Sequence, residues 1–486
     1  MGSKEHSGWV MGGEGSIEAR LTAFEEAYQW LLGLIQDPTG ERVKLVKSQE
    51  MYQVEHGLRL ERTREFLAFC GQPQEKFPAI HIAGTSGKGS VTTILAAILT
   101  AWGARTGHHI SPYLQLCTEK LIVNGRWLRP SAFAELVNVH FRPKYEAWIG
   151  AGHDLRYGEA WVALTYIWLA LEEVEWGVME TGLGGRYDPT NVLPAKIGII
   201  TNVDWDHIKT LGPTLADIAR HKAGIIKPGQ WVVSTAEKPL VREIVAAEAA
   251  VQGAELLQMG RDFAVEEVVM TAEGSRFNLV TPWGVWEDIR LPLAGAFQVT
   301  NAAAALMGAA VAREVFGQAG SVAMARAAVA EVRFSGRMEL MQTEPLVILD
   351  GAHNGPKMAA LVASVAAWRG ERPVWVILGA LASKSATGIL APLVGIGSWF
   401  GVTEPNVYAK MPHSAAALAA ELGEMVAGVP VTIYDGVEAA IRDAVAQAPA
   451  EAIILVTGSL YLVGEARGCW YPQQQLLLDI EATGWP

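Results

Sequence analysis

The sequence has few cysteines and no excess of positive charge. Only 3 of the 486 residues are cysteines, and Cys70, Cys117 and Cys469 lie far apart. This spacing matches neither a metal site nor a disulfide framework, and it is typical of a reducing compartment. A formal net charge of −12 argues against nucleic-acid binding as the main task. An anionic small molecule would therefore have to be held by a few local cations and backbone N–H groups.

Long apolar runs are also missing. None reaches the roughly 18 residues that a membrane-spanning helix needs, and the longest, at 92–102 and 302–312, suit buried helices. The first residues lack the basic stretch and apolar core of a secretory signal, so we expect a cytoplasmic protein. We also expect a monomer that binds small molecules and neither nucleic acid nor a membrane.

What is present is the composition of a globular protein with large buried sheets. Apolar residues make up 50% of the chain and charged residues 19%. The length favours two domains. From the pattern described next, we predict a flexible tail over 1–16, a first domain over 17–332, a linker over 333–338 and a second domain over 339–486.

Alternating strand and helix patterns predict an α/β fold with a mainly parallel sheet. Between 262 and 293 the apolar period changes to two, which predicts an antiparallel meander. A second series of strands and helices begins near 346. The strands predicted for the first series are 77–83, 177–180, 197–203 and 231–234. Those of the second are 346–350, 374–378, 399–402, 431–434 and 452–456.

A glycine-rich turn joins the first predicted strand to a helix. Its sequence is Gly84-Thr85-Ser86-Gly87-Lys88-Gly89-Ser90. Glycines let the backbone curl so that successive N–H groups point at phosphate oxygens, and the helix start adds its positive dipole end. Lys88 supplies a charge for the phosphates, and Ser90 can reach a phosphate or its magnesium. This arrangement favours a nucleotide-phosphate site over an ordinary glycine-rich turn.

Polar residues follow the next two strands. Glu180 ends one strand, and His207 follows another. Because the carboxyl ends of parallel strands share one edge of the sheet, the two side chains could meet there and hold Mg²⁺. Histidine is an unusual magnesium ligand, so a loop histidine is the competing interpretation. Lys222 lies on a helix predicted over 215–225 and is, from its type alone, a helix-surface lysine.

Several motifs, taken in order, resemble those of the folylpolyglutamate synthase/dihydrofolate synthase family in the Mur ligase superfamily. The glycine-rich turn resembles the family's GTxGKxx loop, and 180–191 (ETGLGGRYDPTN) resembles its ExGLGGRxDxTN signature. Further segments similar to family motifs are 111–114, 119–125, 206–207, 221–229, 336–337, 350–354 and 457–461. Together these segments span nearly the whole chain.

The resemblance implies a P-loop ATPase domain and a smaller Rossmann-like C-terminal domain, with ATP and substrate in the cleft between them. It implies a ligase that adds L-glutamate to a folate, or to dihydropteroate, through an acyl phosphate. The implied ATP contacts are Gly84, Thr85, Gly87, Lys88, Gly89, Ser90, Asn301, Arg337, Asp350 and His353. The implied ligands of two magnesium ions are Ser111, Glu180, His207 and a carbamylated Lys222. Catalytic roles fall to Lys88, Lys222 and His207.

Departures from the family pattern fall mainly on the acceptor side. Tyr113 stands where the family has histidine, and Phe297 replaces the histidine that precedes Gln298. The family's Thr-x-Phe-Glu run, which lines the dihydropteroate pocket, appears as Arg156-Tyr157-Gly158-Glu159. The acceptor pocket implied for this chain is lined by Tyr113, Arg156, Tyr157 and Asp188.

Two alternatives stay open. One is a ligase of the same mechanism that uses another carboxylate, which Arg156 and Gly158 suggest. The other is a nucleotide-binding protein without catalysis. The joint presence of the catalytic and metal-binding residues argues against the second alternative, because drift would rarely spare all of them.

Overall fold

The computed structural model describes residues 15–37, 49–271, 274–293 and 295–485. Most of the predicted flexible tail, residues 1–14, lies outside this part of the chain. Ser16 is described, and its hydroxyl caps the first helix, α1 (Ile17–Leu32), by accepting a hydrogen bond from the amide of Ala19. None of the described helices is long and apolar enough to cross a membrane.

The first of two large sheets has eight strands, and the glycine-rich turn over 84–90, the predicted phosphate loop, follows one of its central strands. β1 (Ala79–Ala83) pairs in parallel with β5 (Trp176–Glu180) and with β6 (Ile197–Ile200). Because these three strands end at one edge, the loops that follow them lie together. The other parallel strands are β2 (Thr106–His109), β7 (Trp231–Ser234) and β8 (Glu255–Gln258). The antiparallel edge is formed by β3 (Ile122–Val123) and β4 (Arg126–Trp127).

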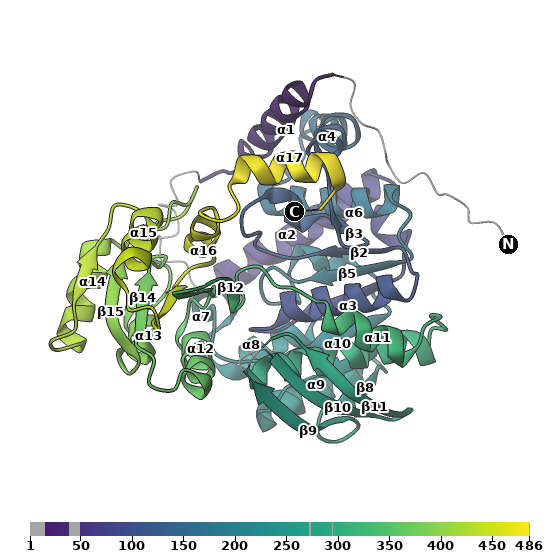
Figure 1. Ribbon diagram of the computed structural model, residues 1–486. Helices are drawn as coiled ribbons and strands as arrows, with labels where there is room; N and C mark the ends of the chain where they lie inside the picture. Colours follow the sequence, from purple (N-terminus) through teal and green to yellow (C-terminus); the bar gives the residue numbers. More distant parts are fainter. Residues whose placement is uncertain (1–14, 38–48, 272–273, 294, 486) are drawn as a thin grey trace.

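Helices cover both faces of this sheet (Figure 1). Successive side chains of a strand point to opposite faces, so Ile80 and Ile82 enter one core and Ala79 enters the other. The first core is closed by α3 (Lys88–Ala101), α10 (Ala296–Glu314) and α11 (Val322–Ala330). The second is closed mainly by α1, α2 (Gln49–Phe69), α4 (Pro130–Glu135), α5 (Arg142–Gly150) and α6 (Tyr157–Leu171). Near the opposite edge, against β6, β7 and β8, lie α7 (Ile208–Leu211), α8 (Leu215–Ala223) and α9 (Pro239–Val251).

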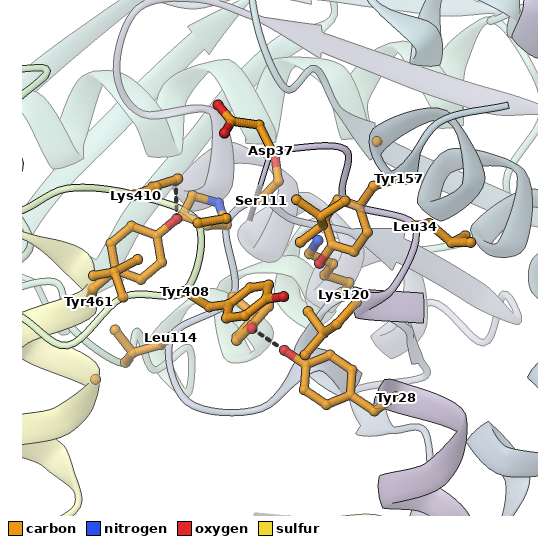
Figure 2. Close-up of a pocket in the computed structure, with 18 of the residues that line it drawn as sticks. Tyr28, Leu34, Asp37, Ser111, Leu114, Lys120, Tyr157, Tyr408, Lys410 and Tyr461 are labelled. Atoms are coloured by element: carbon orange, nitrogen blue, oxygen red, sulfur yellow. Dashed lines mark hydrogen bonds between the residues drawn. The ribbon is translucent and has the colours of Figure 1, made fainter. Parts of the chain in front are cut away.

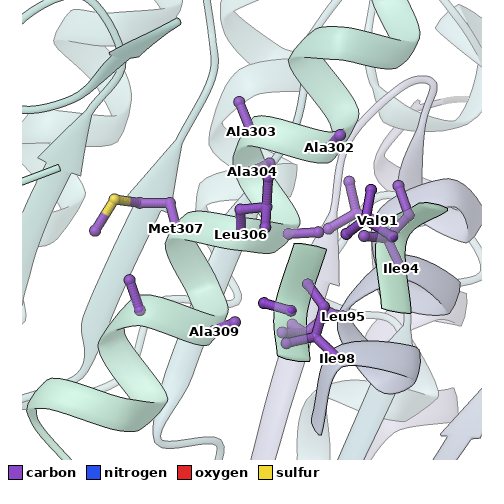
Figure 3. Packing of buried hydrophobic residues seen from close by; sticks show 14 of the residues in the cluster. Val91, Ile94, Leu95, Ile98, Ala302, Ala303, Ala304, Leu306, Met307 and Ala309 are labelled. Atoms are coloured by element: carbon purple, nitrogen blue, oxygen red, sulfur yellow. The ribbon is translucent and has the colours of Figure 1, made fainter. Parts of the chain in front are cut away.

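Helix α10 packs closely on α3 because its buried face is made largely of alanine (Figure 3). At Gly308 a Cβ would lie 2.8 Å from Cδ1 of Ile199 on β6, so even a methyl group would require that side chain to move. Small side chains of this kind let two elements approach closely. The close packing brings Asn301, in the first turns of α10, to the phosphate loop.

The predicted change to a two-residue period corresponds to a small antiparallel sheet. It consists of β9 (Ala264–Thr271), β10 (Gly274–Thr281) and β11 (Gly284–Leu291). Its inward side chains, Phe277, Leu279, Trp286 and Ile289, join the core of α3 and α10. The appended sheet therefore supports the helix that carries Asn301.

The second large sheet has six strands in the order β12-β13-β17-β14-β15-β16. All pair in parallel except the edge strand β12. Its strands are β12 (Glu339–Thr343), β13 (Leu346–Leu349), β14 (Val374–Leu378), β15 (Gly397–Val402), β16 (Val431–Ile433) and β17 (Ile453–Thr457). Its helices are α12 (Gly355–Trp368), α13 (Ala386–Val394), α14 (Ala415–Met425), α15 (Val437–Gln447) and α16 (Leu460–Arg467).

The last helix, α17 (Gln473–Thr483), leaves the second sheet and packs on the first domain (Figure 1). The carboxylate of Glu481 accepts hydrogen bonds from the Arg20 guanidinium at 2.8 Å and from the amide of Ser131 at 2.9 Å. Leu476 and Ile480 bury against Leu116. The predicted second domain, 339–486, includes α17, whereas the contacts of this helix described above are with the first domain.

The predicted fold class is confirmed: the chain has a mainly parallel first sheet and a smaller second α/β unit. The domain boundaries stay a prediction. The predicted linker, 333–338, lies between α11 and β12, so it is the connection at which the chain passes from one sheet to the other.

Candidate active site

The phosphate loop is fixed to the segment that follows β6. The Thr85 amide donates to the carbonyl of Asn202 at 2.8 Å, and the Ser86 amide donates to the Asn202 side-chain oxygen at 2.9 Å. The Thr201 hydroxyl donates to the carbonyl of Ser86 at 2.7 Å. These bonds hold the loop in one shape before any ligand binds, which reduces the entropy lost on binding.

Two glycines of the loop are required by close approach. A Cβ at Gly84 would lie 1.7 Å from Oγ1 of Thr201. A Cβ at Gly87 would lie 2.0 Å from Oδ1 of Asn301, and Gly87 also has a positive φ of 82°. Asn301 therefore lies against the loop, as its predicted ATP contact requires, and Gln298 orients its amide by accepting a hydrogen bond at 3.0 Å.

Lys88 and Glu180 face each other at the start of α3. Lys88 Nζ lies 3.6 Å from Oε1 of Glu180 and donates to the carbonyl of Gly84 at 3.3 Å. The other carboxylate oxygen of Glu180 accepts the Ser111 amide at 3.1 Å. Burial raises the pKa of Glu180, while Lys88 and that amide act in the opposite direction. A carboxylate, a backbone amide and a cation thus meet beside the phosphate loop.

Lys222 is buried, which corrects its interpretation as a helix-surface lysine. Only 4% of the residue is exposed, and Nζ donates to the carbonyl of Gly84 at 2.7 Å. Burial, followed by the charge of Lys88, lowers the pKa of Lys222 well below its usual range. Within the described part of the chain no ion pair is recorded for this amine. The side chain of Lys222 therefore points from α8 toward the phosphate loop and not toward solvent.

His207 lies at the start of α7 with a positive φ of 51°. Its side chain is 44% exposed, and Nε2 is 3.7 Å from Oδ1 of Asp206. Desolvation, together with the charges of Lys384, Lys222 and Lys88, lowers the pKa of His207 to about 4, although Asp206 acts to raise it. The imidazole is thus neutral at pH 7, the form in which it can bind a metal.

The second domain and the linker before it add three of the predicted residues to this centre. Asp350 is buried, and its two oxygens accept the amides of Ala352 and Met338. Burial raises the pKa of both Asp350 and Glu180, and the charge of Arg337 opposes this rise in each, so the guanidinium acts on both domains. His353 Nδ1 donates to the carbonyl of Gly351 at 2.7 Å, which leaves Nε2 3.0 Å from Nζ of Lys357.

The carboxylate of Asp206 makes polar contacts that join the domains directly. The Asp206 carboxylate pairs with Lys384 at 3.0 Å and accepts from the Asn354 amide at 3.2 Å. Asp206 belongs to the loop that carries His207, whereas Lys384 and Asn354 belong to the second domain. The loop that carries His207 is therefore attached to the second domain.

A cavity of about 940 Å³ opens next to Ser111, between the two domains (Figure 2). Its lining includes three predicted acceptor residues, Tyr113, Arg156 and Tyr157. Lys120 also lines it, with Nζ 4.3 Å from the ring centroid of Trp161, and burial lowers the pKa of Lys120 to about 8. Its tyrosines are Tyr28, Tyr113, Tyr157, Tyr408 and Tyr461. The cavity thus combines aromatic faces with a lysine that has no carboxylate partner recorded within the described ranges.

The guanidinium of Arg156 is paired with two carboxylates. Its Nε lies 3.2 Å from Oδ2 of Asp154 and its Nη1 lies 3.3 Å from Oε1 of Glu55. Gly158 has no side chain, and the space beside it is filled by Arg59, whose Nη2 would lie 2.8 Å from a Cβ at this position. Both Arg59 and Glu55 come from α2, whose contribution to this wall the sequence patterns did not indicate.

Asp188 lies outside this cavity. One oxygen accepts the amide and the hydroxyl of Thr190, and the other accepts the amide of Leu183 at 2.7 Å. Both oxygens are therefore occupied in holding the turn after β5. The geometry gives Asp188 a structural role and does not support its predicted place among the acceptor residues.

Two families of domains match the chain. The Mur ligase middle domain matches residues 82–309, and the Mur ligase glutamate ligase domain matches residues 336–460. The dihydrofolate synthase/folylpolyglutamate synthase of Mycobacterium tuberculosis is 32% identical, over 84% of this chain and 89% of that protein. The folylpolyglutamate synthase of Lacticaseibacillus casei is 30% identical, over 84% of this chain and 93% of that protein.

The chain belongs to the folylpolyglutamate synthase/dihydrofolate synthase family. The predicted resemblance is confirmed. A structure of the Mycobacterium tuberculosis folylpolyglutamate synthase complexed with ADP superposes with a TM-score of 0.81 at 28% identity, covering 93% of this chain and 99% of that one. The protein is thus an ATP-dependent ligase of the Mur type that acts on small molecules, and the alternative of a nucleotide-binding protein without catalysis is wrong.

Sequence patterns missed several residues that this ligase places in its cavity. Tyr408 and Lys410 come from the second domain, and Arg59 comes from α2. No spacing rule singles them out, because each lies in an irregular or polar segment. The one available signal was Gly158, since a glycine in a predicted pocket wall requires another side chain to fill its space.

Glu465, on the rim of the ligase cavity, gives a test of stability against pH. Burial raises the pKa of Glu465 from 4.5 to about 7. Between these values the unfolded chain releases a proton that the folded protein keeps, so the free energy of unfolding falls as pH rises. We expect Glu465→Gln to be more stable than wild type by on the order of 1–3 kcal/mol at pH 8, with a smaller difference at pH 5.

Urea denaturation of both proteins at the two pH values measures this difference. Glutamine keeps an oxygen for the Asn406 amide, which Glu465 accepts at 2.6 Å. Glu438→Gln is the control, because that side chain is 74% exposed. An equal difference at both pH values would contradict the raised pKa.

Proposed function

We propose that this ligase adds L-glutamate to a folate, and to dihydropteroate less readily. The observation that carries the proposal is the 940 Å³ cavity of tyrosines and Lys120, which is lined by Ser111, whose amide bonds Glu180 beside the phosphate loop. Such a cavity suits a long, flat acceptor whose carboxylate must reach the nucleotide. One similar structure, at TM-score 0.73 and 27% identity, is an FPGS–AMPPCP–folate complex.

The proposed chemistry has two steps. An acceptor carboxylate oxygen attacks the γ-phosphorus of ATP, and ADP leaves, which gives an acyl phosphate. The glutamate amine attacks the acyl carbon, and inorganic phosphate leaves as the amide forms. Lys88 neutralises charge on the phosphates, and the interdomain cavity holds the two substrates together.

Magnesium fits the donor set next to the phosphate loop, and we assign it to Ser111, Glu180 and His207. One carboxylate and one hydroxyl beside the nucleotide phosphates suit an ion that keeps few protein ligands, although no cluster of three acidic, histidine or cysteine side chains occurs within the described residues. When bound, magnesium would neutralise phosphate charge. A carbamate on Lys222 would supply further oxygen ligands at a second site, and the burial of this amine beside Lys88 supports that modification.

The acceptor preference is a test of the proposed function. We expect tetrahydrofolate to be extended faster than dihydropteroate. Dihydropteroate lacks the glutamate arm, so its ring would have to lie deeper, against the wall where Gly158 offers no stacking face and Arg59 fills the space. A missing stacking face costs on the order of 1 kcal/mol or more. Amide formation is measured with purified enzyme, ATP, Mg²⁺ and glutamate, with each acceptor alone.

Faster turnover of dihydropteroate would contradict the pocket argument. If neither acceptor forms an amide while the enzyme still binds ATP, the result would favour the same ligase chemistry on another carboxylate. No observation now favours that alternative, because the guanidinium of Arg156 that suggested it is paired with Asp154 and Glu55.

We further propose a cytoplasmic monomer. Cys70, Cys117 and Cys469 are free thiols, which supports a reducing environment. The cavity is built from the two domains of one chain, so the proposed reaction requires no second copy.

A further inference from the structure

Tyr408 lies in a loop of the second domain, over 403–412, that reaches the cavity of the first domain. Figure 2 shows it near the middle of the cavity, between Tyr461 of its own domain and Tyr28 of α1. The side chain is 58% exposed. Within the described residues it has no recorded hydrogen bond, ion pair or ring contact.

The other tyrosines of the cavity are already engaged. The hydroxyls of Tyr28 and Tyr113 lie 2.5 Å apart. Tyr157 packs edge-on against Trp161, and the Tyr461 ring lies under the ammonium of Lys410 at 4.4 Å. Tyr408 is the tyrosine of this cavity with no such contact recorded among the described residues, so its ring is left for a ligand.

The loop that carries Tyr408 is anchored on both sides. On the N-terminal side of Tyr408, the Asn406 amide donates to Glu465 Oε1 at 2.6 Å. After it, Lys410 donates to the Tyr461 hydroxyl, and the carbonyl of Met411 accepts the Ala382 amide at 2.9 Å. An exposed aromatic ring on an anchored loop is a prepared contact, because little freedom is lost when a ligand packs on it.

The wall of the first domain has no ring at Gly158 and carries the Arg59 guanidinium there instead. We propose that Tyr408 is a specificity-determining residue that stacks on the planar heterocycle of the acceptor. This inference rests on the proposed function. It makes the second domain a part of the acceptor site, so acceptor binding favours the arrangement in which the two domains are close.

Steady-state kinetics of Tyr408→Ala and Tyr408→Phe test the proposal with two acceptors, tetrahydrofolate and p-aminobenzoyl-glutamate, which lacks the heterocycle. We expect Tyr408→Ala to raise KM for tetrahydrofolate roughly tenfold, since aromatic stacking has that effect. KM for p-aminobenzoyl-glutamate and for ATP should stay within about twofold. Tyr408→Phe keeps the ring and should behave like wild type.

The matched control is Met411→Ala, which changes an exposed side chain of the same loop that does not line the cavity. An equal rise in KM for both acceptors would show a disturbed loop and overturn the stacking role. An unchanged KM in Tyr408→Ala, with wild type active on tetrahydrofolate, would overturn the inference and leave the proposed function standing. Wild type inactive on both acceptors would overturn the proposed function and this inference with it.

Discussion

Replacing Lys88 with alanine should lower kcat by about 10²–10³-fold or more, the loss seen when a preorganised charge-stabilising group is removed. Lys88 lies at the start of α3, 3.6 Å from Glu180, where the β- and γ-phosphates must lie if the loop binds them. Charge on the transferred phosphoryl group spreads over its oxygens, and an ammonium placed there stabilises it. Without that cation the loop amides remain, so nucleotide binding should weaken less than turnover.

The measurement is phosphate release with saturating ATP and acceptor, together with thermal unfolding to show that the variant is folded. Lys76→Ala is the matched control, because Lys76 is an exposed lysine outside the site. A folded Lys88→Ala variant with the wild-type rate would show that this loop does not serve the reaction.

Lys222→Ala should lower activity at least about 100-fold, because even an outer-shell partner of a metal ligand contributes 10–100-fold. The amine is buried and its recorded contact is with the Gly84 carbonyl. If it carries a carbamate, the variant lacks an anionic ligand and leaves a space of that shape. Added formate or acetate should then restore part of the activity.

The control for this variant is Arg220→Ala on the same helix, since the Arg220 side chain is 62% exposed. Mass spectrometry of gently handled protein, with and without bicarbonate, reports the modification directly. A bare amine in fully active enzyme would reject the carbamate and leave Lys222 as a buried lysine that holds the phosphate loop.

Much of the fold could be predicted because local patterns determine it. The strands Trp231–Ser234 and Val374–Leu378 have the predicted bounds, since buried parallel strands are continuous apolar runs between turns. The phosphate loop was also predictable, because its glycines, lysine and helix start occur within a few consecutive residues. The antiparallel sheet near 264–291 was indicated by its two-residue period.

The rest depends on contacts between distant segments. Lys222 closes a helix turn that also contains Arg220 and His221, so its type and neighbours suggest a surface. It is buried because its amine meets Gly84, 138 residues earlier in the chain. The pairing of Arg156 with Glu55 depends on α2 packing beside α6, which no local period reports.

Helix α17 gives the second domain a second point of attachment. The first is the connection at 333–338, and the other is the segment that leads into α17, whose Glu481 is fixed to Arg20 and Ser131 of the first domain. A rigid body held at two points can rock about the line that joins them but cannot slide or twist freely. Because the contacts of Asp206 with Lys384 and Asn354 would also have to break, we expect any opening of the cavity to be a rotation about the line that joins these two chain connections.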